Sequence, residues 1–177
     1  MSLSHCLPLV LAAALLSGCA SMSEKECLTV DWREQGQRDG QNGYPLSRIE
    51  EHREACAKVR VAPDLAAYRA GRDVGIQQYC TRSNGIEQGR HGRSYRNACP
   101  AQLEPAFLEG HRAGSRVHQA QQRADQLQNN LYSKQSELDR AKDDAARKRL
   151  REELRLLDQR LRSAREEIND AERRLRY

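Results

Sequence analysis

Aromatic residues are scarce in this sequence, and apolar residues are few. Only 5% of its 177 residues are aromatic, with a single Phe and a single Trp. The mean hydropathy is −0.90, and 31% of the residues are charged. Such a chain cannot bury a large hydrophobic core, although its regular apolar spacing argues against plain disorder. We therefore expect an all-α protein with one small domain joined to an elongated segment.

Motifs of hydrolases, metalloenzymes and nucleotide-binding proteins are also missing. The histidines after residue 18 form no His-x3-His or His-Glu-x2-His pair, so a zinc hydrolase lacks its ligands. No Gly-x-Ser-x-Gly segment or phosphate-binding loop is present. His52 precedes Cys56 by four residues, but a disulfide would consume that thiol. The sequence predicts a protein that is not an enzyme and has no metal and no cofactor. The histidines are His52, His91, His111 and His118.

An apolar run near the N-terminus, Leu9 to Leu16, is too short to span a bilayer but has the length of a signal-peptide core. It ends in the tetrapeptide Leu-Ser-Gly-Cys, with Cys19 last. This tetrapeptide resembles the lipobox of bacterial lipoproteins, in which the Cys thiol is acylated before cleavage. Met1 to His5 departs from that pattern because it contains no Lys or Arg. An ordinary secretory signal, or a buried helix with an incidental Cys, is the alternative.

The lipobox resemblance implies a signal peptide over residues 1–18 and a lipidated tether over residues 19–27. Several acyl chains on Cys19 would hold the protein at a membrane, since each buried CH₂ contributes about 0.8 kcal/mol. No Asp directly follows Cys19 to signal inner-membrane retention, which implies the outer membrane and a domain facing the periplasm. The pI near 9.0 favours anionic partners, but export argues against nucleic acid.

Four further cysteines predict two disulfides in an exported protein. A metal site is the alternative, but the spacings are wide and no Cys-x-x-Cys pair exists. In a simple up-and-down arrangement of helices, three of these cysteines would lie at one end and Cys80 at the other. The pairing therefore stays open. The four residues are Cys27, Cys56, Cys80 and Cys99.

A glycine-paired pattern recurs in residues 28–114, the predicted helical domain. Two glycines four residues apart lie on one face of a helix, and each costs about 1 kcal/mol relative to Ala. They predict that another backbone or an aromatic ring approaches closely. Charged flanking residues exclude a membrane-dimerisation motif. The pairs are Gly36/Gly40 after Trp32, Gly71/Gly75 after Tyr68, Gly110/Gly114 after Phe107, and a degenerate Gly89/Gly92 after Ile86.

Helix-start signals separate these pairs. Side-chain caps and prolines predict the starts, and the predicted helices together form a small domain stapled by disulfides. The predicted starts are Ser47, in a capping box with Glu50, then Pro63-Asp64, Asn84-Gly85, and Pro100 or Pro105.

Several segments between residues 24 and 114 share a characteristic order of Gly, Tyr and Cys. They are Asp31-x4-Gly36-x2-Asp39-Gly40, His52-x3-Cys56, Tyr68-x2-Gly71-x3-Gly75-x3-Tyr79-Cys80-Thr81, Asn84-Gly85-x3-Gly89-x2-Gly92 and Cys99-Pro100. Together they resemble a family of uncharacterised bacterial envelope lipoproteins defined only by a domain of unknown function. The resemblance implies a cysteine-bearing envelope domain and brings no catalytic residue or substrate with it.

Residues 115–177 contain neither Gly nor Pro, and residues 150–175 carry an apolar seam. Apolar residues alternate at spacings of four and three, which predicts a coiled coil. A parallel homodimer would oppose like charges at its flanking positions, whereas an antiparallel pair opposes unlike charges. We therefore expect antiparallel self-association, or pairing with another envelope protein. The seam is Leu150, Leu154, Leu157, Leu161, Ala164, Ile168, Ala171 and Leu175.

An internal antiparallel arrangement is equally open. An earlier apolar seam over residues 127–145 changes phase before Leu150, so a hairpin could turn at residues 146–149. Without Gly or Pro in that turn, one continuous helix of about 95 Å is the alternative. The hairpin would pair Leu138 with Leu157 and Leu131 with Ala164.

The favoured function is that of a structural or adaptor lipoprotein whose coiled coil engages a partner. The alternative is a binding module for anionic envelope components, either lipid phosphates or peptidoglycan carboxylates. The arginines expected to serve it are Arg38, Arg72, Arg90, Arg93 and Arg96.

Overall fold

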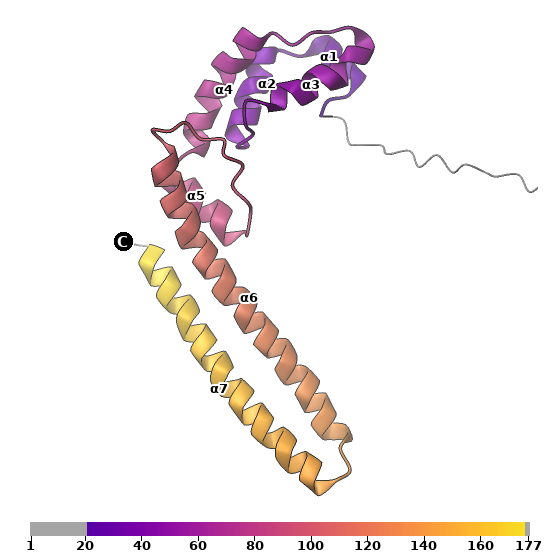
Figure 1. Ribbon diagram of the computed structural model, residues 1–177, viewed down its shortest axis with the longest axis vertical. Coiled ribbons are helices and arrows are strands. Elements are labelled where there is room, and N and C mark those ends of the chain that lie inside the picture. Colours follow the sequence, from indigo (N-terminus) through magenta and orange to yellow (C-terminus); the bar gives the residue numbers. More distant parts are fainter. Residues whose placement is uncertain (1–20, 176–177) are drawn as a thin grey trace, which may run out of the picture.

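The structure, a computed structural model, describes residues 21–175 and is all-helical in that range (Figure 1), as predicted. The predicted signal peptide and the acylation of Cys19 lie outside the described residues. The helices are α1 (Glu24–Thr29), α2 (Trp32–Gln41), α3 (Arg48–Cys56), the 3-10 turn η1 (Ala57–Val59), α4 (Leu65–Tyr79), α5 (Arg82–Arg90), α6 (Glu104–Arg140) and α7 (Asp144–Leu175).

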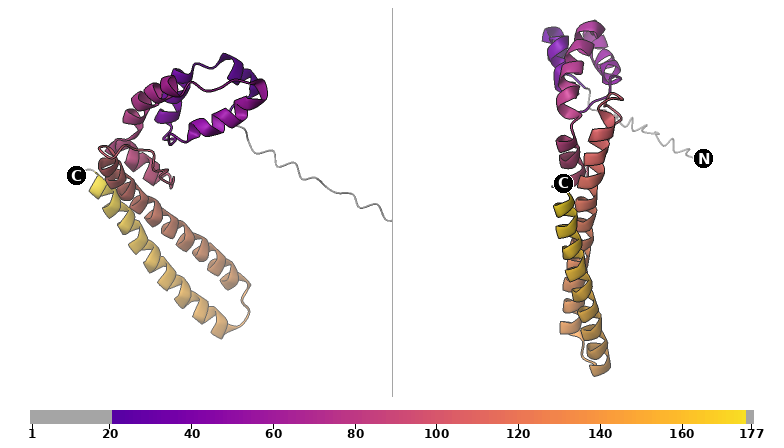
Figure 2. Two further views of the ribbon diagram at one scale, coloured as in Figure 1. Left: turned by 45° about the horizontal axis from the view of Figure 1, so that its top comes forward. Right: turned by 90° about the vertical axis from the view of Figure 1, so that its left-hand side faces the viewer.

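The molecule is elongated, with the short helices at one end and the α6–α7 hairpin extending away from them (Figures 1 and 2). Helix α2 packs on α4, α5 packs on α6, and α6 also packs on α7. The predicted boundary at residue 115 falls inside α6, so one continuous helix belongs to both the domain and the hairpin. Within residues 21–175, no helix is both long and apolar enough to cross a bilayer.

Helices α2 and α4 approach so closely that only glycine fits between them. A Cβ at Gly36 would lie 2.0 Å from the Tyr68 carbonyl oxygen, and one at Gly71 would lie 1.8 Å from that of Arg33. Since real Cβ atoms do not come this near to a backbone oxygen, each helix needs its glycines to contact the other. The expected close approach is therefore made by backbone.

Helices α5 and α6 meet in the same way. Gly85 and Gly89 of α5 face the backbone of α6, with Cβ positions 2.2 Å from the carbonyl oxygens of Phe107 and His111. The predicted pair Gly89/Gly92 was therefore wrong, because Gly85 supplies the partner glycine. Gly92 lies beyond α5 at a φ of +67°, in a turn that ends the helix.

Helix α3 starts directly after Ser47 as predicted, whereas the capping box there and the start of α5 at Asn84-Gly85 were wrong. Ser47 makes no side-chain capping hydrogen bond at the start of α3, so its capping box is absent. Helix α5 begins at Arg82, before Asn84-Gly85, because the Thr81 side chain accepts a hydrogen bond from the Asn84 backbone N–H. The Asp64 cap of α4 was predicted correctly.

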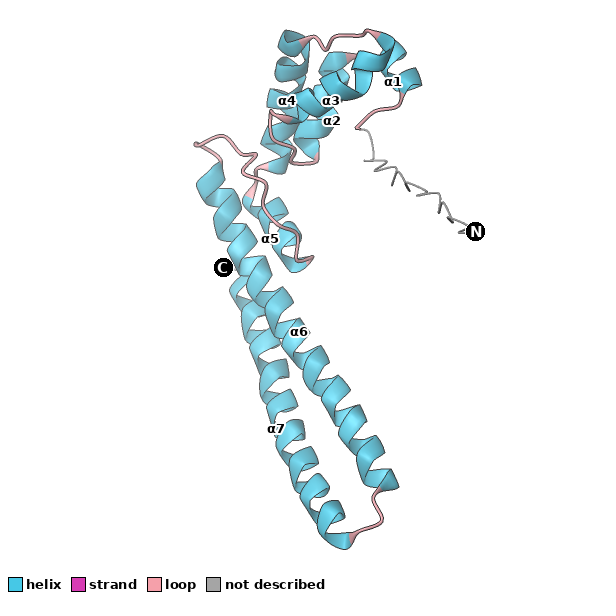
Figure 3. Cartoon of the chain, turned by 45° about the vertical axis from the view of Figure 1, so that its right-hand side comes forward, coloured by secondary structure: helices cyan, strands magenta, loops and turns pink. Residues whose placement is uncertain are grey.

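The two predicted disulfides are confirmed, and they join Cys27 to Cys56 and Cys80 to Cys99. The simple up-and-down arrangement was wrong for Cys99. Residues 91–103 form a loop that runs back along the domain (Figure 3), and it returns Cys99 to the junction of α4 and α5. Around that bridge, Tyr79 and Phe107 stack with ring centres 5.0 Å apart.

The tail forms a hairpin, but it turns earlier than residues 146–149, which lie inside α7. Helix α6 ends at Arg140, and the Asp143 carboxylate caps α7 by accepting from the Ala146 N–H. The seam of α7 faces α6, and all its members are at least partly buried. Leu161 and Ala164 are buried against Ala124, and Leu127, Leu131 and Ile168 pack around them.

The hairpin returns to the domain where it started. Glu172, near the end of α7, accepts a hydrogen bond of 2.6 Å from Arg90 of α5. A second ion pair, Arg123 with Glu167, joins α6 to α7 nearby. These two ion pairs join the last turns of α7 to α5 and to α6.

Candidate functional site

A buried polar network lies between α2, α3 and α4. The Asp39 carboxylate, 5% exposed, accepts hydrogen bonds from His52 Nε2 at 2.8 Å and the Tyr68 hydroxyl at 2.7 Å. Its other oxygen accepts from Gln35 Nε2. Burial, followed by the hydrogen bond to Asp39, raises the pKa of Tyr68.

Ser21 extends this network toward the N-terminal segment. Its hydroxyl lies 2.9 Å from His52 Nδ1. In the neutral imidazole, Nε2 donates to the Asp39 carboxylate and Nδ1 accepts from Ser21. The order Ser–His–Asp is that of a hydrolase triad, but His52 is 1% exposed, and only Ser21 is open to a substrate. The Cys56 thiol is consumed by its disulfide with Cys27, as expected.

Arg72, one of the five candidate anion-binding arginines, is buried and has a structural role. Its side chain donates to the Tyr44 carbonyl oxygen at 3.0 Å and to that of Ala98 at 2.8 Å. Burial lowers the pKa of its guanidinium. Arg72 therefore ties α4 to two loops, with its Nε and Nη2 donors engaged inside the protein.

Arg38 and Arg90 are also engaged by carboxylates of the chain. Arg38 forms an exposed ion pair with Glu34 at 3.0 Å, one turn away on α2. Arg90 bonds to Glu172 of the hairpin. Both charges are compensated locally, which weakens their attraction for an external anion.

The remaining two candidates, Arg93 and Arg96, line one groove of about 410 Å³. Both guanidinium groups lie close enough to the Tyr79 phenol to oppose the rise that burial causes in its pKa. We call this site the arginine groove. Its lining is Gln41, Asn42, Tyr44, Tyr79, Gln88, Arg93, Ser94 and Arg96.

Tyr44 orders one wall of the arginine groove. The guanidinium carbons of Arg48 and Arg96 each lie 4.5 Å from the centre of its ring. Cation–π contacts of this kind restrain a long side chain that would otherwise sample many rotamers. Arg96 is therefore held at the groove although it is exposed to solvent.

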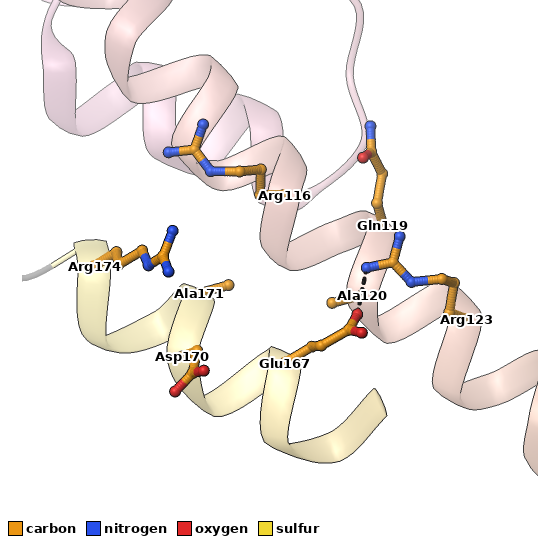
Figure 4. Close-up of a pocket in the computed structure, with 8 residues that line it drawn as sticks. All are labelled: Arg116, Gln119, Ala120, Arg123, Glu167, Asp170, Ala171 and Arg174. Carbon is orange, nitrogen blue, oxygen red and sulfur yellow. Dashed lines mark hydrogen bonds and ion pairs between the residues drawn. The ribbon is translucent and has the colours of Figure 1, made fainter. Parts of the chain in front are cut away.

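The hairpin carries two further concave surfaces. Near the domain, Ala120 and Ala171 lie on either side of a cleft between α6 and α7, and the Arg123–Glu167 ion pair bridges it (Figure 4). Farther along, Leu156 lines a groove of about 480 Å³ between the same helices. We call this the hairpin groove. It is lined by Arg123, Leu127, Leu156, Gln159, Arg160, Ser163, Ala164 and Glu167.

Residues 31–116 match a family model described as "Protein of unknown function (DUF2799)". The chain contains a DUF2799 domain. The match runs from the cap of α2 into the first part of α6 and includes the glycine pairs of α2, α4, α5 and α6, which confirms the predicted domain of unknown function. The Cys27 half of one disulfide and most of the hairpin lie outside the DUF2799 domain. No curated protein and no solved structure matches the chain.

Metal binding has no visible site in the described part of the chain. Among residues 21–175, no three His, Cys, Asp or Glu side chains gather as ligands. Two of the concave surfaces differ in chemistry: the arginine groove lies in the DUF2799 domain, and the hairpin groove lies beyond it. The first offers charge and hydrogen bonds, and the second offers apolar contact.

Proposed function

We propose that the protein is a lipid-anchored envelope protein that acts as a structural adaptor through its α6–α7 hairpin. The observation that carries this proposal is the exposed apolar residue in the hairpin groove. Leu156 is 42% exposed and lies in one concave surface with Leu127 and Ala164. A two-helix hairpin leaves this side of its seam open, and a partner helix would cover it.

The rim of the hairpin groove carries both signs of charge. Arg123 and Arg160 lie along it together with Glu167. Mixed charges suit an antiparallel helix that presents the opposite pattern, including the same surface of a second copy. We propose that the partner is a second hairpin of this protein or a helix of another envelope protein. The rigid domain would then hold that partner near the membrane.

The test is the substitution Leu156→Asp in the full chain purified in detergent. It should weaken association about tenfold or more, because a buried Leu contributes roughly 1.5–3 kcal/mol. Sedimentation measures self-association, and a photo-crosslinker at position 159 in cells detects a different protein. Leu65→Asp is the matched control, since Leu65 on α4 is 43% exposed.

Two results would contradict the adaptor role. One is a chain that stays monomeric and gives no specific crosslink from position 159. The other is a crosslink that Leu156→Asp leaves unchanged. The anchor is tested on the same preparation, because an intact mass showing an uncleaved and unmodified N-terminus would remove the membrane attachment from the proposal.

A further inference from the structure

The arginine groove lies where the C-terminal ends of α2 and α5 meet the loop after α5. Both helix ends are closed by the same turn. Tyr44 and Arg93 donate their backbone N–H groups to the carbonyl oxygens of Asp39 and Gln88, five residues back. Since these hydrogen bonds satisfy the terminal carbonyls, the Arg93 and Arg96 side chains are not needed to cap the helices.

The charge in this groove is uncompensated by its own walls. None of the eight described residues that line it is acidic, whereas two are arginines. Both side chains line the same groove, where Arg96 stacks over the Tyr44 ring and Arg93 Nη1 lies 3.4 Å from the side-chain oxygen of Gln88. Guanidinium forks are well matched to carboxylate and phosphate oxygens. Together, Arg93 and Arg96 form a site for an oxyanion.

The other residues that line the arginine groove favour a polar ligand over a lipid. No lining residue is aliphatic, and Gln41, Asn42 and Gln88 provide amide donors and acceptors. An acyl chain would find no apolar wall there. A sugar or peptide group next to the oxyanion would instead meet amides and the Tyr44 ring.

We infer that the arginine groove binds a carboxylate carried by a polar polymer, and that in the envelope this ligand is a peptidoglycan fragment. The choice of a carboxylate and of peptidoglycan rests on the proposed envelope location, whereas the preference for an oxyanion on a polar ligand rests on the groove alone. This site is separate from the hairpin groove, so the chain would hold a partner helix and a cell-wall ligand at different places.

The test is calorimetric titration of the oxidised full chain with soluble peptidoglycan fragments whose stem-peptide carboxylates are free. Arg93→Gln with Arg96→Gln should weaken binding about a hundredfold, roughly tenfold for each charged hydrogen-bonding group. Arg147→Gln with Arg151→Gln near the hairpin turn is the matched control, because it changes the net charge equally. Binding should also weaken as salt increases.

Three outcomes would overturn the inference. The groove double variant could bind as tightly as the control, the fragments could bind equally well with amidated carboxylates, or the chain could bind only vesicles of anionic phospholipid. Thermal unfolding of both double variants verifies that they fold. Because no step uses the hairpin groove or a partner helix, loss of the adaptor proposal leaves this result unaffected, and the converse also holds.

Discussion

Asp39 shows how one carboxylate organises the interior of a domain with few aromatic residues. It accepts from three side chains on three helices, namely Gln35, His52 and Tyr68. A buried acceptor that loses its donors destabilises the fold, and so does a buried donor that loses its acceptor. The network therefore specifies how α2, α3 and α4 pack as well as stabilising them.

Removing this carboxylate should destabilise the fold more than removing an exposed one. In Asp39→Ala, the imidazole of His52 and the hydroxyl of Tyr68 would remain buried without their acceptor. We expect the free energy of unfolding to fall by about 3 kcal/mol, measured by denaturant titration. Asp73→Ala on the exposed face of α4 should change it by no more than about 0.5 kcal/mol. Equal effects of the two substitutions would contradict the role given to Asp39.

The helix pairs of the domain depend on backbone contact at glycine. The α2–α4 and α5–α6 pairs share this packing: Gly71 meets the Arg33 carbonyl as Gly110 meets that of Arg82. This contact makes little use of large apolar side chains. It accounts for a stable domain in a sequence whose composition provides few of them.

Gly71→Ala tests this contact, because the sign of the change in stability shows whether α2 and α4 need a glycine there. On helix propensity alone, replacing Gly by Ala stabilises a helix by about 1 kcal/mol. Here the new methyl group would overlap a backbone oxygen that lies 1.8 Å away. We expect a loss of about 3 kcal/mol instead, as in other overpacked interiors, measured by thermal unfolding. A more stable variant would show that α2 and α4 do not need this contact.

Element types could be predicted from the sequence, but some boundaries could not. The heptad spacing from Leu150 to Leu175 predicted α7 and its buried face. This prediction holds because the apolar face of a helix is buried whichever helix packs against it. The turn of the hairpin was misplaced because Asp143, a side-chain cap, starts α7 in the absence of Gly or Pro. Gly85 was missed since it follows Asn84 and the dipeptide also fits a helix start.

The same limit applies to the candidate sites. The five arginines looked equivalent in the sequence. In the structure Arg72 is buried, Arg38 pairs with Glu34 and Arg90 pairs with Glu172. Only the loop after α5 brings Arg93 and Arg96 beside Tyr44 and Tyr79, which are far away in the chain. No local sequence pattern predicts that these four side chains line one groove. The Asp39–His52 pair is equally non-local, since it joins two helices through the domain interior.

At the scale of the whole molecule, the two disulfides stabilise different parts. Cys27–Cys56 attaches α1 to α3 across a separation of 29 residues, and Cys80–Cys99 returns the loop after α5 to the end of α4. The second bridge also fixes the loop that carries Arg93 and Arg96. Its loss should therefore affect the arginine groove, whereas loss of the first should not.

Cys80→Ser with Cys99→Ser should reduce stability by about 3 kcal/mol, as expected for closing a loop of this length. It should also weaken binding of peptidoglycan fragments, since the loop would gain freedom. The double variant Cys27→Ser with Cys56→Ser is the control: it should lose comparable stability and keep its affinity. Calorimetric unfolding and titration on the same samples separate the two effects. Equal affinity of the two double variants for the fragments would show that the Cys80–Cys99 bridge does not order the arginine groove.

The contact between Arg90 and Glu172 has a practical consequence for anyone who attaches a reporter to this protein. Because α7 runs back to α5, a fluorescent group placed after Leu175 reports on the globular end of the molecule. The far tip, at Lys142, is a distance of about 55 Å along α6 from its beginning. Measurements of how far the protein reaches from a surface therefore require a label inserted at that tip, and a terminal tag would underestimate the reach.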